Sequence, residues 1–193
     1  MNCKIGMVSL GCAKNQTDAE TMLGILLEDG CTISGDPSEA DVIIVNTCGF
    51  IESAKRESID ALLEMAQYKE ENCKLLIASG CLAERYSEEI KTEIPEVDAI
   101  VGTGDYDKIA QAIKLAFSGE KPVICGHRDR TPEERLPRIL TTPSYTAYLK
   151  IADGCDNNCT YCAIPKIRGH FRSRTIEDIV SEAKELCENG VKE

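Results

Sequence analysis

The sequence predicts an α/β fold: an open, mostly parallel sheet with flanking helices, followed by the first βα unit of a truncated (β/α) barrel. Two observations predict the sheet. Short continuous runs of Val, Ile and Leu alternate with segments of helical period, and such runs are typical of strands that are covered on both faces. A third observation, a reversal of charge near residue 120, indicates where the sheet ends and a second part begins.

Five apolar runs are expected to be buried strands, at 5–10, 42–47, 75–79, 99–101 and 122–125. Between them, apolar residues at helical spacing predict helices around 59–66 and 109–117. The string TDAE at Thr17 to Glu20 has the spacing of a capping box, which predicts the start of the first helix there. This alternation of strands and helices favours a parallel sheet with helices on its faces.

Charge and proline content divide the chain into three parts. Residues 1–120 hold 10 basic and 22 acidic residues and are expected to form one domain, whereas residues 121–174 hold 10 basic and 5 acidic ones. Residues 121–144 are interpreted as a basic, proline-containing linker, either a solvated connector or a segment suited to a polyanionic partner. Residues 145–193 are interpreted as the start of a second domain.

The second domain is expected to open with a strand at 145–152, a cysteine-rich loop and a helix from Thr175. The string TIED predicts a capping box for that helix, and its expected apolar stripe is Ile176, Ile179, Val180, Ala183, Leu186 and Cys187. One strand and one helix cannot bury both faces of a parallel unit, and a closed barrel takes about 250 residues. The chain is therefore expected to be a fragment.

The cysteine content is unusual, with 11 cysteines in 193 residues at a net charge of −11. The N-terminus lacks the pattern of a secretory signal, and no apolar run approaches the ~18 residues that cross a bilayer. The sequence therefore predicts a cytoplasmic protein without a membrane segment. A reducing compartment and an odd count argue against a disulfide framework and favour metal or sulfur chemistry.

The string GCDNNCTYC places Cys155, Cys159 and Cys162 in one loop with CxxxCxxC spacing. Three thiolates so close in sequence can hold three corners of a cubane iron–sulfur cluster, whose usual protein complement is four. One iron would then stay open to another ligand. The alternative is a zinc site, for which paired CxxC motifs at longer separation are typical.

Three further cysteines share one context, directly after a predicted strand and before a predicted helix. They are Cys12, Cys48 and Cys81, each beside a glycine: Gly11, Gly49 and Gly80. The carboxyl ends of parallel strands meet at one edge of a sheet, so these thiols can converge on a second three-cysteine cluster. The alternative is that they are buried packing residues. That core role is expected for the other five cysteines, Cys3, Cys31, Cys73, Cys125 and Cys187.

Taken together, the two cysteine sets resemble the methylthiotransferase family of radical S-adenosylmethionine enzymes. The resemblance covers nearly all 193 residues: the three-cysteine domain, the linker, and then GCDNNCTYCAIPKIRGHFRSR. The strings VSLGCAKNQTDAE, NTCGFIESAKRESID and GCLAERYSEEIKTEIPEVDAIVG are similar to the RimO-type branch, which modifies a ribosomal protein. The segment IPKIRGHFRSR is shared with the tRNA-modifying MiaB-type branch and does not discriminate between the two.

The resemblance implies two 4Fe-4S clusters and S-adenosylmethionine as cofactors. It implies that Cys155, Cys159 and Cys162 hold the radical-generating cluster, that Cys12, Cys48 and Cys81 hold an auxiliary cluster, and that Tyr161 stacks on the adenine. No single catalytic side chain is assigned. The implied reaction inserts a methylthio group at the β-carbon of an aspartate in protein twelve of the small ribosomal subunit. Implied partners are that ribosomal protein, an electron donor such as flavodoxin or ferredoxin, and an unknown sulfur donor.

Alternative functions remain open at this point. Within the family, the alternative is methylthiolation of tRNA at isopentenyl-adenosine next to the anticodon. Outside it, the chain would be a noncatalytic iron–sulfur protein or a zinc-binding interaction module. The overall charge of −11 argues against tight nonspecific binding of nucleic acid. Because most of the barrel would be missing, this chain alone is expected to be inactive.

Overall fold

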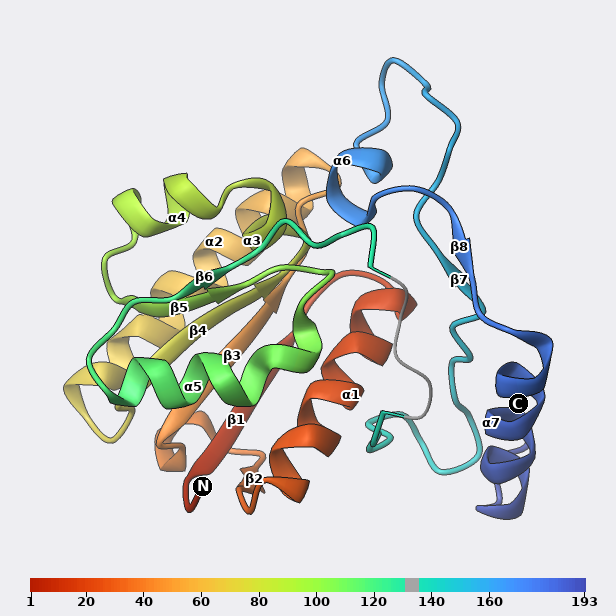
Figure 1. Ribbon diagram of the computed structural model, residues 1–193. Coiled ribbons are helices and arrows are strands. Elements are labelled where there is room, and N and C mark those ends of the chain that lie inside the picture. The colour runs from red at the N-terminus through yellow and green to blue at the C-terminus, as the bar shows by residue number, and fades with distance from the viewer. Residues whose placement is uncertain (131–135) are drawn as a thin grey trace.

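The computed structural model describes residues 1–130 and 136–193 and contains a six-stranded parallel sheet (Figure 1). Its strands lie in the order β2-β1-β3-β4-β5-β6. Their bounds are β1 Lys4–Ser9, β2 Thr32–Ser34, β3 Val42–Thr47, β4 Leu75–Gly80, β5 Val97–Val101 and β6 Val123–Ile124. We call residues 1–125, which contain all six strands, the sheet region.

Helices cover both faces of this sheet. Helices α1 (Ala13–Glu28) and α5 (Ile109–Phe117) lie on one face, and α2 (Glu52–Ala66), α3 (Cys81–Arg85) and α4 (Ser87–Glu93) lie on the other (Figure 1). Short 3-10 turns occur at Pro37–Glu39 (η1), Gln67–Glu70 (η2) and Tyr106–Lys108 (η3). Successive strand residues face opposite sides, so Ile44 and Ile77 join one core whereas Ile43 and Leu76 join the other. The predicted α/β fold of this region is confirmed.

Two details of the sheet region differ from the sequence prediction. Strand β2 was not predicted, because Thr32–Ser34 is a short edge strand without an apolar run. The capping box at Thr17 to Glu20 is wrong as a helix start: α1 begins at Ala13 with Cys12 as its N-cap. The Thr17 hydroxyl instead donates to the carbonyl oxygen of Ala13 at 2.9 Å, a bond typical of threonine inside a helix.

Residues 145–193, which we call the cysteine-loop region, contain two short strands and two helices. Strands β7 (Ala152–Asp153) and β8 (Arg172–Ser173) form a two-stranded antiparallel sheet, and the helices are α6 (Ile164–Arg168) and α7 (Ile176–Glu188). The strand predicted at 145–152 is wrong in extent. Its first residues have only isolated backbone bonds, such as the 2.9 Å bond from the Ala147 N–H to the Glu193 carbonyl, and no ladder that would make a strand.

Helix α7 has the predicted start but not the predicted orientation. The Thr175 hydroxyl accepts from the backbone N–H of Asp178 at 3.3 Å, which confirms the cap. The expected apolar stripe is only partly buried: Ile179, Ala183 and Leu186 are half-buried. The expected burial is wrong for Ile176, which is 75% exposed, and for Val180 and Cys187, which are also exposed. The helix faces the protein through Asp178 and Glu182, whose carboxylates bind arginines, and this ionic face decides how it packs.

The segment between β6 and β7 contacts α1 in one of its described parts, where the Ile139 N–H donates to the Glu20 carbonyl at 3.1 Å (Figure 1). Its described parts, residues 125–130 and 136–151, contain no helix or strand, and residues 131–135 of the predicted linker lie outside the described residues. Strand β6 extends the sheet slightly past residue 120. Among the described residues, no helix has the length and apolar character needed to span a membrane.

Candidate cysteine cluster sites

The first candidate site is the carboxyl edge of the sheet, where β1, β3 and β4 end. The chain places β2 on one side of β1 and then crosses to place β3 on the other side, so the strand order reverses between β1 and β3. In open α/β sheets, ligands bind at such a switch point. Cys12 is the N-cap of α1, Cys48 follows β3, and Cys81 is the first residue of α3. The prediction that all three leave strand ends is confirmed.

Glycines let the three loops approach one another closely. A Cβ on Gly11, whose φ is +97°, would lie 2.9 Å from the Cys48 Cβ and 3.1 Å from its Sγ. A Cβ on Gly49 would lie 2.9 Å from the Leu82 Cα and 3.3 Å from the Cys81 carbonyl carbon. Contacts this short exclude any side chain at either position. The two glycines therefore bring the loop that carries Cys48 against those that carry Cys12 and Cys81.

Asn15, on the first turns of α1, joins the same three loops by hydrogen bonds. Its amide nitrogen donates to the carbonyl oxygens of Leu10 at 3.0 Å and of Thr47 at 2.8 Å, at the ends of β1 and β3. Its amide oxygen accepts from the Cys81 thiol at 3.4 Å. Asn15 is fully buried, so these bonds form in a low-dielectric setting and hold the edge rigidly.

The environments of Cys12 and Cys48 differ. The Cys48 backbone is held by Ser58 of α2, whose hydroxyl accepts from the Cys48 N–H at 2.8 Å and donates to its carbonyl at 2.9 Å. Cys12 is exposed and lies in a hollow whose lining includes Gln16 and Thr141.

Cys81 is contacted by a side chain from the cysteine-loop region. Burial raises the pKa of the Cys81 thiol to about 11, and the Arg168 guanidinium opposes that shift. The Arg168 Nη2 lies 3.7 Å from the Cys81 Sγ and donates to the Asn15 amide oxygen at 2.8 Å. The end of α6 therefore reaches the edge where the three loops meet, and Figure 1 shows α6 beside that edge.

The second candidate site is the loop with Cys155, Cys159 and Cys162, which projects from the protein above α6 (Figure 1). Its base is anchored: the Cys155 N–H donates to the Gly169 carbonyl at 3.1 Å, and the Asp156 carboxylate accepts from the Phe171 N–H at 3.1 Å. Its tip is open, since Cys159 is exposed. The loop therefore has a fixed base, one exposed thiol at Cys159 and two half-buried thiols at Cys155 and Cys162.

Tyr161, at the tip of this loop, has a side chain that is 89% exposed. An exposed ring is free to stack on a planar ligand such as the adenine that the resemblance implies.

Of the predicted core cysteines, Cys3, Cys31 and Cys73 are buried as expected, and Cys125 is half-buried.

The donor chemistry of both sites fits iron–sulfur clusters. Each set offers three thiols and no hard oxygen donor set, and thiolates are the ligands of such clusters. In the part of the chain that the structure describes, no three His, Cys, Asp or Glu side chains lie close enough together to share one metal ion. A cubane occupies the space between its thiolates, so its ligands lie farther apart than the ligands of a single ion. At the first site, Gly11 and Gly49 let the three cysteine-bearing loops pack against one another, which brings thiols from three separate loops to one edge.

Comparison with known sequences assigns both regions. The profile described as "Uncharacterized protein family UPF0004" matches residues 4–102, which contain β1 to β5 and the first cysteine set. The chain belongs to the UPF0004 family. The profile of the radical SAM superfamily matches residues 149–193, which contain the second set.

Named relatives of this UPF0004 chain cover nearly all of it. The proteins named "Ribosomal protein uS12 methylthiotransferase RimO" from Clostridioides difficile, Acetivibrio thermocellus and Thermoanaerobacter sp. are 59%, 55% and 53% identical to it, over 98%, 100% and 98% of the chain. The chain spans 43%, 44% and 43% of their respective lengths. The resemblance to the N-terminal part of RimO-type methylthiotransferases is confirmed.

Sequence reasoning missed Asn15 and Arg168, which connect the two sites. Asn15 lies one helical turn after Cys12 in the string GCAKN, and an amide at that spacing was the one available signal. Arg168 gave no signal, because arginines are mostly exposed and this one is 3% exposed.

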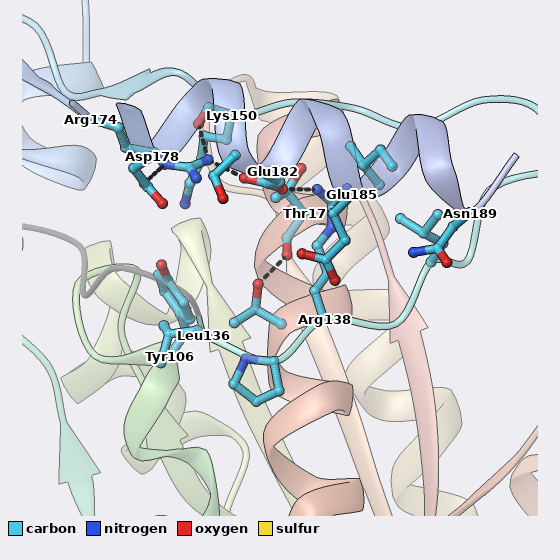
Figure 2. Close-up of a pocket in the computed structure, with 15 residues that line it drawn as sticks. Thr17, Tyr106, Leu136, Arg138, Lys150, Arg174, Asp178, Glu182, Glu185 and Asn189 are labelled. Atoms are coloured by element: carbon cyan, nitrogen blue, oxygen red, sulfur yellow. Dashed lines mark hydrogen bonds and ion pairs between the residues drawn. The ribbon is translucent and has the colours of Figure 1, made fainter. Parts of the chain in front are cut away.

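A pocket away from both cysteine sets lies between α1, the segment around Arg138 and α7 (Figure 2). Two of its cations are paired within it: Arg138 binds Glu182 at 2.8 Å, and Arg174 binds Asp178 at 2.6 Å. Glu20 of α1 binds Arg138 at 2.6 Å as well. Arg138 thus joins Glu182 of α7 to Glu20 of the sheet region, so we interpret the pocket as a polar seam between the two regions.

Proposed function

We propose that this chain carries the auxiliary-cluster region and the start of the radical SAM region of a methylthiotransferase. The proposed substrate is ribosomal protein uS12, modified at the β-carbon of an aspartate, and the proposed cofactors are two 4Fe-4S clusters and S-adenosylmethionine. The observation that supports it most strongly is the packing of three cysteine-bearing loops at one sheet edge through Gly11 and Gly49, with α6 of the second region against that edge.

The chain's own residues would divide the work between the two sites. Cys12, Cys48 and Cys81 would hold the auxiliary cluster, and Cys155, Cys159 and Cys162 the radical-generating cluster. When bound, the two clusters and S-adenosylmethionine supply the electron, the radical and the sulfur chemistry that protein side chains lack. Asn15 would orient the edge around Cys81, and the exposed Tyr161 ring would stack on the adenine.

The identity of the metal tests this proposal against its structural alternative. Anaerobic reconstitution of the chain with iron, sulfide and zinc in competition should load iron and sulfide at both cysteine sets. Zinc without iron would instead make the chain a zinc-binding module. Replacing the buried pair Cys3 and Cys31 by Ser is the matched control, since both thiols lie in the core and outside both sets.

The substrate is tested in cells that lack the gene for the full-length enzyme. Mass analysis should show uS12 without its methylthio group, while the methylthiolated nucleosides of tRNA stay unchanged. Loss of the tRNA modification with unchanged uS12 would assign the chain to the tRNA-modifying branch. The isolated 193-residue chain is proposed to be inactive, so methylthiolation of uS12 by it alone, with a flavodoxin or ferredoxin as electron donor, would contradict that part.

A further inference from the structure

Arg168 is a buried cation at the contact between the two cysteine sites. It ends α6, a few residues after Cys162, and is 3% exposed. The backbone around it is fixed, because the Thr103 hydroxyl of the sheet region donates to the Ile167 carbonyl at 2.6 Å. Burial alone would lower the pKa of the guanidinium, but the Asp18 carboxylate and other anionic partners raise it well above its usual value. Arg168 therefore stays charged inside the protein.

The guanidinium bridges the two regions. Its Nη1 binds the Asp153 carboxylate at 2.9 Å, two residues before Cys155 in the sequence. Its Nη2 binds the Asp18 carboxylate at 2.9 Å and the Asn15 amide oxygen at 2.8 Å, both on α1, and lies 3.7 Å from the Cys81 Sγ. One planar group thus contacts two places at once. One is the base of the loop with Cys155, Cys159 and Cys162, which we call the radical-cluster loop, and the other is the sheet edge with Cys12, Cys48 and Cys81, which we call the auxiliary edge.

The charged groups around Arg168 place one cation against Cys81. Two buried carboxylates, Asp18 and Asp153, face two buried cations, Lys150 and Arg168, and the half-exposed Lys14 lies 3.7 Å from Asp153. Of these charged groups, it is Arg168 that lies within 3.7 Å of the Cys81 Sγ. An anionic group held by Cys81 would be stabilised by that charge, and more strongly as it gains an electron.

We propose that Arg168 is a positioning residue that docks the radical-cluster loop on the auxiliary edge and whose charge raises the reduction potential of the auxiliary cluster. This inference rests on the proposed function. Charges and hydrogen bonds near the thiolates are among the factors that set such potentials. A positive charge beside one ligand favours the reduced, more negative state, so the potential falls when the charge is removed.

The test measures the auxiliary-cluster potential in three Arg168 backgrounds. To isolate that cluster, Cys155, Cys159 and Cys162 are replaced by Ala, the chain is reconstituted with iron and sulfide, and a redox titration is followed by electron paramagnetic resonance. Arg168→Gln should lower the reduction equilibrium constant about tenfold, which is about 59 mV for one electron. Arg168→Lys keeps the charge and should restore most of the potential.

The matched control is Arg138→Gln. Arg138 also joins the two regions and is also largely buried, but it binds Glu20 and Glu182 in the polar seam instead of contacting a cysteine. It should leave the potential unchanged. The Arg168 variants should fold, since Lys150 still faces Asp18 and Lys14 still faces Asp153 in them.

Equal shifts in Arg168→Gln and Arg168→Lys would overturn the inference, because packing and not charge would then set the potential. An unchanged potential in both would overturn it too, while leaving the proposed function intact. If the chain with the loop cysteines replaced binds no cluster at all, the auxiliary site itself is wrong, and the proposed function and this inference both fail.

Discussion

The sheet region and the cysteine-loop region are held together by different forces. In the sheet region, β3 and β4 are buried along their whole length between two apolar cores. In the cysteine-loop region, Ile167 is the one apolar side chain in the buried core, and the contacts to the sheet region include ion pairs such as Lys150 with Asp18 and hydrogen bonds such as Thr103 with Ile167. Burial of apolar area stabilises a fold without regard to direction, whereas buried ion pairs fix one geometry. From this difference we infer that the apolar cores of the sheet region supply most of the stability of the fold, whereas the polar contacts of the cysteine-loop region fix how that region is aligned on the sheet region.

The largest effect is expected from a substitution in the apolar core of the sheet region. Ile77, at the centre of β4, is fully buried, and Ile77→Ala should lower the free energy of unfolding by about 2–5 kcal/mol through lost transfer energy and a cavity. Val180→Ala on α7, where Val180 is 44% exposed, should change it by less than about 0.5 kcal/mol. Chemical denaturation measures both. Similar losses for the two variants would contradict the contrast between the regions.

The next largest effect is expected from a substitution that removes an ion pair between the two regions. Lys150 is buried with Asp18, and Lys150→Met removes a hydrogen bond to a charged group, which contributes about 1.5–3 kcal/mol. Hydrogen exchange should become faster in α7 while the amides of β3 and β4 stay protected. The control Arg56→Met removes the exposed pair with Glu52, for which about 0.5 kcal/mol or less is expected. Equal rates of hydrogen exchange in α7 for both variants would contradict the view that ion pairs hold the two regions together.

A glycine pair sharpens the comparison within the sheet region. Gly80 and Gly119 both have φ near +90°, at +90° and +88°. A Cβ on Gly80 would lie 2.5 Å from the Thr47 carbonyl oxygen, whereas one on Gly119 would meet nothing within 4 Å. Gly80→Ala should therefore cost about 1–3 kcal/mol more than Gly119→Ala, because only the first adds overpacking to the backbone strain. Equal costs, measured by thermal denaturation, would mean that the edge beside Cys81 is loosely packed.

The smallest effect concerns pH. Asp105 is fully buried, and although burial raises its pKa, Lys108 and His127 lower it below its usual value on balance. A lowered pKa in the folded state means that the stabilisation is present above the unfolded pKa of about 3.9 and is lost as pH falls through the folded value. The stability difference between the wild type and Asp105→Asn should thus shrink between about pH 5 and about pH 3. A constant difference over that range would contradict the ion pairs of Asp105.

The sequence predicts correctly those elements that a local pattern of residues encodes. Val42–Val45 is a continuous apolar run, the strand Val42–Thr47 that contains it is buried at every residue, and the cysteine that follows it lies at the sheet edge as predicted. Short polar edges carry no such pattern, so β2 was missed. The docking of Arg168 on Asn15 joins residues far apart in the chain through buried charges, and single-sequence periodicity contains no information on it.

The same reasoning explains what was wrong about α7. Its amphipathic pattern predicted the helix correctly, because periodicity reports on helix formation. The pattern did not report which face would contact the protein. In the structure, Glu182 meets Arg138 and Arg174, and ionic partners outside the helix decide its orientation while Ile176 stays exposed.

The most direct test of the two-cluster proposal is iron content after anaerobic reconstitution of three proteins. The wild type should bind two four-iron clusters, about eight irons per chain. Replacement of Cys12, Cys48 and Cys81 by Ala should leave about four irons, and replacement of Cys155, Cys159 and Cys162 by Ala should also leave about four. Eight irons in the first variant, or four in the wild type with no loss in that variant, would contradict an auxiliary cluster at the sheet edge.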